Sequence, residues 1–101
     1  MSDNNFVIED AKLTVNTDLQ AGMEDALREA CASLLSSEAA TLRIDLSAVK
    51  YIHSLSVGML SYAWVEALSR DKDMSFLVSQ EVADVFERTG LSKVFSFEVG
   101  D

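Results

Sequence analysis

From Phe6 onward, the apolar residues of the chain switch regularly between the spacing of a strand and the spacing of a helix. Alternation of apolar and polar residues predicts half-buried strands, whereas apolar residues three or four positions apart predict amphipathic helices. A turn near Asp10 separates the first two strand patterns, and a helical pattern separates each later pair. The predicted strands are FVIED, KLTV, TLRIDLS, MSFLVS and VFSFEV.

The resulting β-β-α-β-α-β-α-β order predicts an α/β sandwich. Strands that are joined by helices pair in parallel, and such crossovers are right-handed. We therefore expect a small mixed sheet, mostly parallel after an initial hairpin, with helices packed against it. A chain of 101 residues is long enough for one core. Residues 6–101 should form a single domain, and residues 1–5 should form a flexible N-terminus.

Start and stop signals predict the bounds of the helices. Thr17 opens the capping-box pattern TDLQ, so the first helix should run from about Asp18 to Leu35. The second helix should span residues 54–70. The third lies in SQEVADVFERTG and should stop at Gly90. Cys31 falls within the apolar stripe of the first helix, so we expect a buried core residue rather than a reactive thiol.

Charge and composition limit the partners and the compartment. The net charge is −9, and an acidic surface repels phosphate groups, so nucleic acid and anionic membrane are poor partners. The sequence contains no apolar run of the roughly 20 residues that a transmembrane helix needs. It starts without the basic and apolar segments of a secretory signal. A single cysteine cannot form an internal disulfide. We therefore expect a cytoplasmic protein that is monomeric when isolated.

The stretch IDLSAVKYIHSLSVGML begins like a buried strand and ends like a helix. In α/β sheets, functional residues gather where strands end and helices begin, which is where Ser54 lies. The free amides and partial positive charge of a helix N-terminus can stabilise a phosphate. A serine at the same place can also simply cap the helix. The position of Ser54 alone leaves both roles open.

This stretch resembles the signature of STAS domains, as found in bacterial anti-sigma factor antagonists. That signature reads approximately D-L-S-x-V-x-F-[IM]-D-S-[SA]-G-L-G-x-L. KLTVNT is similar to the segment before the first helix of the family, and VFERTGLSKVFSF is similar to its ending. The resemblance extends from about Phe6 to Val99. The residues that fit the signature are Asp45, Leu46, Ser47, Val49, Tyr51, Ile52, Ser54, Gly58 and Leu60.

The resemblance implies regulation of transcription by partner switching. In this family, the unphosphorylated antagonist docks on an anti-sigma factor, which is often also a serine kinase, and the sigma factor is released. The kinase then phosphorylates the serine of the D-S motif, and a phosphatase resets the cycle. By position, the phosphoacceptor of this chain would be Ser54, within a motif that also includes His53, Leu55, Ser56 and Gly58.

The chain departs from the signature around this serine. His53 replaces the usual aspartate, Leu55 a small residue and Ser56 a glycine. A histidine repels an incoming phosphate less than a carboxylate does, and Ser56 places a β-carbon where a partner could need close approach. Ser47 and Ser56 are the other candidate hydroxyls. The alternative is a phosphorylation-independent STAS interaction subunit of a larger assembly, such as a lipid-transport or stress-sensing complex.

An enzyme is a weaker interpretation of the same residues. SLSVG is one residue away from the G-x-S-x-G nucleophile elbow, with Ser56 in the nucleophile position. The only histidine lies on the same turn, where it is badly placed to act as the base of a triad. One histidine and one cysteine on separate elements form no metal site, and no glycine-rich phosphate loop occurs. We expect no enzymatic activity, no metal and no cofactor.

The helix at residues 54–70 carries apolar residues on both of its faces. At 100° per residue, one set of side chains should face the core. A second set shares the opposite face with Glu66 and Arg70, where a soluble helix should be polar. We expect this second set to form a docking surface, although a loop or a neighbouring helix could also cover it. The predicted core set is Val57, Leu60, Trp64, Ala67 and Leu68, and the predicted partner-binding set is Leu55, Met59 and Tyr62.

Overall fold

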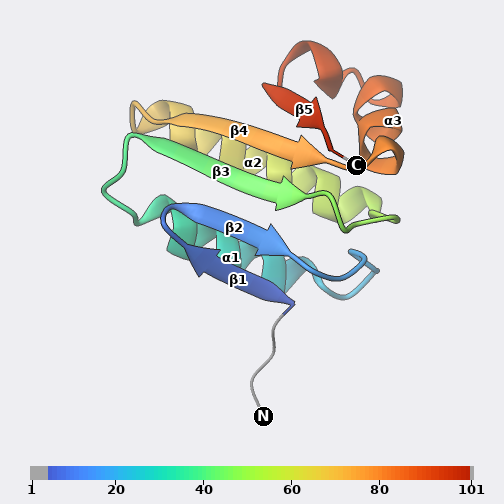
Figure 1. The fold of residues 1–101 in the computed structure, drawn as a ribbon, viewed down its shortest axis with the longest axis horizontal. Coiled ribbons are helices and arrows are strands. Elements are labelled where there is room, and N and C mark those ends of the chain that lie inside the picture. The colour runs from blue at the N-terminus through green and yellow to red at the C-terminus, as the bar shows by residue number, and fades with distance from the viewer. Residues whose placement is uncertain (1–4, 101) are drawn as a thin grey trace.

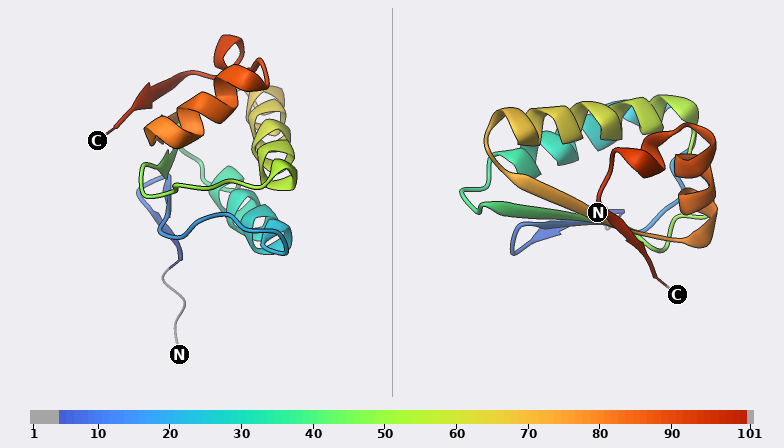
Figure 2. Two further views of the ribbon diagram at one scale, coloured as in Figure 1. Left: turned by 90° about the vertical axis from the view of Figure 1, so that its right-hand side faces the viewer. Right: turned by 90° about the horizontal axis from the view of Figure 1, so that it is seen from above.

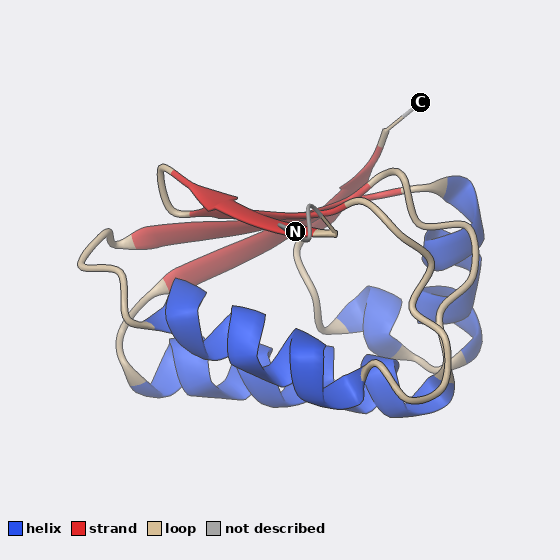
Figure 3. Cartoon of the chain, turned by 90° about the horizontal axis from the view of Figure 1, so that it is seen from below, coloured by secondary structure: helices blue, strands red, loops and turns tan. Residues whose placement is uncertain are grey.

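The computed structural model describes residues 5–100, which form one sheet layer and one helix layer (Figure 1). All the helices lie on one face of the sheet (Figure 3). The strands are β1 (Phe6–Glu9), β2 (Lys12–Val15), β3 (Thr41–Leu46), β4 (Asp73–Val78) and β5 (Phe97–Val99). The helices are α1 (Glu24–Leu35), α2 (Ser54–Ser69), α3 (Gln80–Arg88) and the short 3-10 helix η1 (Leu91–Lys93).

The strands follow one another across the sheet in the order β1-β2-β3-β4-β5. The first pair is antiparallel, and each later pair is parallel. The predicted fold, a small and mostly parallel sheet with helices packed against it, is therefore confirmed. Each helix joins neighbouring parallel strands in the same direction across the sheet, and crossovers of a single hand then place every helix on the same face.

A tight turn joins β1 to β2 at the place predicted from the sequence. Asp10 and Ala11 both have positive φ angles, 53° and 61°. Two such residues in succession produce the twist that suits a two-residue hairpin turn. The carbonyl of Asn5 accepts a hydrogen bond from the amide of Asn16, so the pairing begins one residue before β1. Residues 1–4, most of the predicted flexible N-terminus, lie outside the described residues.

Helix α1 begins at Glu24, so the prediction of a start at Asp18 is wrong. The Thr17 hydroxyl donates to the neighbouring carbonyl of Asp18 instead of capping a helix. Leu19 forms an isolated parallel bridge with Ile52, and this pairing holds the backbone of Leu19 extended. The segment between β2 and α1 is therefore a loop that pairs with another loop. A tertiary contact has overridden the local capping signal.

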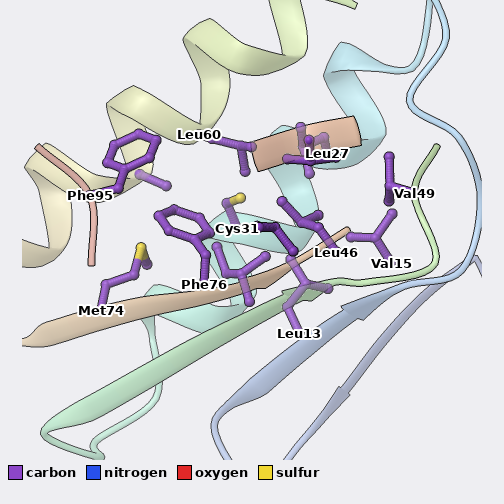
Figure 4. Packing of buried hydrophobic residues seen from close by; sticks show 14 of the residues in the cluster. Leu13, Val15, Leu27, Cys31, Leu46, Val49, Leu60, Met74, Phe76 and Phe95 are labelled. Carbon is purple, nitrogen blue, oxygen red and sulfur yellow. The ribbon is translucent and has the colours of Figure 1, made fainter. Parts of the chain in front are cut away.

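The core lies between the sheet and the helix layer (Figure 4). The rings of Phe76 and Phe95 pack at a tilt of 39° with their centroids 4.8 Å apart, and Phe86 contacts both edge-on. Cys31 is buried among these apolar side chains, as predicted. Burial raises the pKa of the Cys31 thiol to about 12, so the thiol stays protonated at neutral pH and is a poor nucleophile.

Helix α2 packs beside α1 and covers the middle of the sheet (Figure 2). Leu60 and Ala67 are fully buried, as predicted, and Trp64 is half-buried against the core. Leu68 is 56% exposed, so its assignment to the core was wrong. The sequence of α2 contains a single charged residue, Glu66. Because so many of its positions are apolar, the sequence pattern alone does not show where the buried face ends.

We predict that Leu60→Ala lowers the free energy of unfolding by about 2–5 kcal/mol, because it opens a cavity in the core. The matched variant Leu68→Ala, on the same helix, should change it by less than about 0.5 kcal/mol, as expected for a surface position. Urea denaturation of both variants measures the difference. Similar losses for the two leucines would contradict the assignment of the buried face.

Candidate functional site

The candidate site lies at the edge of the sheet where β2, β3 and β4 all end (Figure 1). The turn from Ser47 to His53 leaves β3 there and leads into α2. The loop after β2 and the start of α3 border the same turn. In parallel sheets, this carboxyl edge is where binding sites commonly occur.

His53 is the N-cap of α2. Its backbone is extended, with φ −73° and ψ 149°, and its Nδ1 atom accepts a hydrogen bond of 3.2 Å from the amide of Leu55. The His53 carbonyl accepts the amides of Ser56 and Val57, which starts the helix. An imidazole nitrogen can accept only when it carries no proton. His53 therefore fills the capping role usually taken by Asp, Asn, Ser or Thr.

Ser54 is the first residue of α2 and is exposed. Its hydroxyl has no hydrogen-bond partner within residues 5–100. The capping role that the sequence left open for Ser54 thus belongs to His53, and no group in the described part of the chain engages the Ser54 hydroxyl. The first turn of α2 contains no acidic residue. A phosphate on Ser54 would meet the positive end of the helix dipole without a like charge on its own turn.

The other two candidate hydroxyls are engaged or closed to solvent. Ser47 donates its hydroxyl to the carboxylate of Asp45 at 2.7 Å, and its amide bonds to the same oxygen at 2.9 Å. Ser56 is fully buried, and its hydroxyl has no partner among the described residues. The β-carbon of Ser56 therefore points into the protein. The expectation that it would obstruct close approach of a partner is wrong.

The solvent face of α2 is largely apolar. The side chains of Leu55, Tyr62, Val65 and Leu68 are between 56% and 60% exposed. We call these four residues the exposed apolar face. Gly58 lies on the same side of the helix, and a β-carbon built there would meet no atom within 4 Å. Val65 and Leu68 were not predicted as surface residues, because so many positions of α2 are apolar.

Met59 borders this face but is more buried than its four residues. It is half-buried, packs against the core and lines a groove of about 130 Å³ between α1 and α2. Cys31, Tyr62 and Ala63 line the same groove, so the groove is continuous with the exposed apolar face at Tyr62. The neighbouring helix thus covers part of Met59, which was one of the two outcomes that the sequence left open. Leu55 and Tyr62 are exposed, as the docking interpretation requires.

A cleft of about 260 Å³ lies between the Ser47–His53 turn and α3. Its lining includes the exposed ring of Tyr51 and the apolar side chains of Ile52 and Val85. Lys50 and Glu81 face each other across it with their charged atoms 3.8 Å apart, and both are largely exposed. An exposed pair at this distance contributes little to stability. The cleft thus forms a concave surface along Lys50, Tyr51 and Ile52, the residues that directly precede the capping residue His53.

Sequence patterns did not identify two residues that hold this turn. Asp18 accepts hydrogen bonds from the amides of Lys50 and Tyr51. Ser79, the N-cap of α3, donates its hydroxyl to the carbonyl of Val49 and accepts the amide of Val82. The start of the SQEV segment is a typical cap signal for Ser79. The contact of Asp18 spans 32 residues, and no local signal could have indicated it.

Residues 5–100 contain neither a metal-ligand cluster nor a membrane-spanning helix. No cluster of three or more His, Cys, Asp or Glu side chains there could hold a metal ion. None of the described helices combines the length and the apolar character required to cross a bilayer.

Comparison with known proteins identifies the family. The sequence profile described as "Mlab, STAS domain" matches residues 4–97. The chain belongs to the STAS domain family. A search of curated proteins found no significant match.

Solved structures share the fold of this STAS domain. One is an anti-sigma factor antagonist from Mycobacterium paratuberculosis, with a TM-score of 0.73 and 21% identity over 96% of this chain and 89% of that chain. Another is a putative anti-sigma factor antagonist from Thermotoga maritima, with a TM-score of 0.77 and 17% identity over 95% of this chain and 85% of that chain. At these identities, the similarity establishes the fold.

We predict that His53→Ala lowers the free energy of unfolding by about 1 kcal/mol, because it removes the N-cap of α2. His53→Asp should retain most of the stability, since a carboxylate also accepts the amide of the first turn. Ser54→Ala is the matched control next to the cap, and it should leave stability nearly unchanged. Thermal unfolding checks the series, and a greater loss from Ser54→Ala than from His53→Ala would contradict the assignment of the cap.

The two buried serines should respond in opposite ways to loss of the hydroxyl. Ser56→Ala should raise the free energy of unfolding by about 1 kcal/mol, because it removes an unsatisfied buried hydroxyl and improves helix propensity. Ser79→Ala should lower it by about 1–3 kcal/mol, because it leaves the buried partners of Ser79 without hydrogen bonds. Denaturant titrations measure both changes. Destabilisation by Ser56→Ala would indicate a hydrogen-bond partner for that hydroxyl in solution.

Proposed function

We propose that this STAS domain is an anti-sigma factor antagonist that docks on an anti-sigma factor through α2 and is switched off by phosphorylation of Ser54. The observation that carries the proposal is the free, exposed hydroxyl of Ser54 beside the exposed apolar face of α2. Both structural relatives named above bear the description of anti-sigma factor antagonist. This assignment makes the chain a cytoplasmic regulator that binds its partner without catalysing a reaction.

The apolar face supplies the affinity in this proposal. A helix that is apolar all round is normally buried, and α2 has one side against the core and the other in water. Burying Leu55, Tyr62 and Val65 against a partner would remove apolar area from water at roughly 25 cal/mol per Å². The partner surface should therefore be apolar where it meets α2.

Ser54 supplies the switch. It precedes Leu55 directly, so it lies at the rim of the proposed contact. Phosphorylation adds close to two negative charges, which a closed apolar contact would have to desolvate. The helix N-terminus would stabilise the phosphate in the free protein. Both effects favour separation of the complex. A kinase and a phosphatase of matching specificity are the partners that such a cycle requires.

The experiment starts from capture of the partner with the full chain in native cells and mass spectrometry of Ser54. Calorimetry with the purified partner then compares three forms. Ser54→Ala should bind as the wild type does, whereas Ser54→Asp should bind more weakly by about 1–3 kcal/mol. Ser96→Asp is the matched control, since it adds the same charge at an exposed loop before β5. Equal affinity of all forms would leave Ser54 without a switching role.

Truncation of the apolar face tests the docking surface separately from the charge. Leu55→Ala and Tyr62→Ala should each weaken binding by more than about 1 kcal/mol if they are central contacts. Met59→Ala, at the half-buried position beside α1, should affect stability more than binding. Unchanged affinity of the Leu55 and Tyr62 variants would move the docking surface elsewhere on the domain.

A second candidate function is phosphorylation-independent binding as a subunit of a larger assembly, such as a lipid-transport or stress-sensing complex. The observation that favours it is His53, which occupies the N-cap in place of the carboxylate of the antagonist signature. His53→Asp restores that carboxylate and separates the two candidates. A changed rate of Ser54 labelling by the captured kinase would support the switch. Stable binding to an assembly that labels neither form would support the subunit.

A further inference from the structure

The carboxylate of Asp18 bridges two loops that are far apart in the sequence. Its Oδ1 atom accepts hydrogen bonds from the amides of Lys50 at 2.7 Å and Tyr51 at 3.2 Å. Hydrogen bonds to an ionised carboxylate are stronger than those between neutral groups. Both bonded amides belong to the turn that leads to Ser54.

The residue after Asp18 continues the contact through its backbone. The amide of Leu19 donates to the carbonyl of Tyr51 at 2.9 Å, and the amide of His53 donates to the carbonyl of Leu19 at 2.8 Å. Asp18 and Leu19 together thus engage Lys50, Tyr51 and His53. From the other side, the Ser79 hydroxyl holds the carbonyl of Val49. We call these contacts the turn clamp.

The clamp ends directly at the proposed switch. His53 is both the last residue held by Leu19 and the cap of α2, and Ser54 follows it. Any movement of the Lys50–His53 backbone would change the direction in which the helix begins. Among residues 5–100, the hydroxyl of Ser54 has no hydrogen-bond partner. The place of that hydroxyl on the surface is therefore set by the turn before it.

We propose that Asp18 is a positioning residue for Ser54, fixing the turn so that the serine and the start of α2 are presented in one geometry. The functional consequence of this positioning rests on the proposed function, in which a kinase recognises Ser54 and a partner recognises α2. Asp18 is the decisive member because its contacts are made by a half-buried side chain that lies outside the apolar core. Loss of that side chain frees two amides that water can reach, without opening the core.

Amide hydrogen exchange of the ¹⁵N-labelled full chain tests the positioning directly. Asp18→Ala should raise the exchange rates of the Lys50 and Tyr51 amides roughly 10- to 100-fold, and that of the Leu55 amide, which His53 holds, to a smaller extent. The Ile44 amide in β3 should change little. Asp18→Asn keeps an acceptor oxygen at the same place and should restore most of the protection.

Two control variants separate positioning from a general loss of stability. Asp25→Ala removes an exposed carboxylate from α1 that pairs with Arg28, and it should leave the turn protected. Leu35→Ala removes a buried side chain at the end of α1 and should speed exchange throughout the domain. The proposal is overturned if Asp18→Ala leaves the Lys50 and Tyr51 amides protected, or if it speeds exchange everywhere as Leu35→Ala does.

The functional consequence is measured with the kinase and partner captured by the wild-type chain. Asp18→Ala should lower the kcat for Ser54 labelling at least tenfold with a smaller change in KM, and Asp18→Asn should recover most of the rate. Wild-type rates in Asp18→Ala, despite a loosened turn, would refute the positioning role. If the wild-type chain itself is never labelled and finds no partner, the proposed function fails, and the exchange experiment still decides whether Asp18 holds the turn.

Discussion

The sheet buries only one of its faces, and the placement of the helices and of the candidate site follows from that constraint. In β3, Leu42, Ile44 and Leu46 are fully buried, whereas Arg43 between them is exposed. Parallel sheets are usually covered on both faces. Here the alternation provides an apolar surface for one helix layer alone. All the crossovers therefore run over the same face, and the loops that enter the helices gather along one edge of the sheet.

Helix α2 carries more apolar side chains than this single layer can bury. Its inner side packs against the sheet and α1, and its outer side faces water. Glu66 is the one charged residue in its sequence, so the outer side has few groups that interact well with solvent. The same helix begins at the edge where the loops gather. The fold thus places an unburied apolar surface along α2 and an exposed serine hydroxyl at the start of the same helix.

The sequence predicted the order of the elements correctly, because strand and helix periodicities are local properties. It failed where a distant contact decided the local structure. Thr17 has the pattern of a helix cap, yet Leu19 pairs with Ile52 and delays the start of α1. Leu68 is apolar and was assigned to the core, but it is exposed. So many residues of α2 are apolar that the sequence does not show which of them face the core. The free hydroxyl of Ser54 depends on capping by His53, which composition and spacing could not indicate.

Gly58 is an unfavourable residue for the stability of α2, but it leaves the solvent side of the helix open. It lies within α2 on the solvent side, with open space where a β-carbon would be. A glycine inside a helix is less favourable than alanine by roughly 1 kcal/mol, so the isolated domain gains nothing from glycine at this position. The open space leaves the backbone of α2 more exposed on its solvent side than any side chain would allow. At this position the helix gives up some of its propensity and in exchange keeps its backbone accessible from the solvent side.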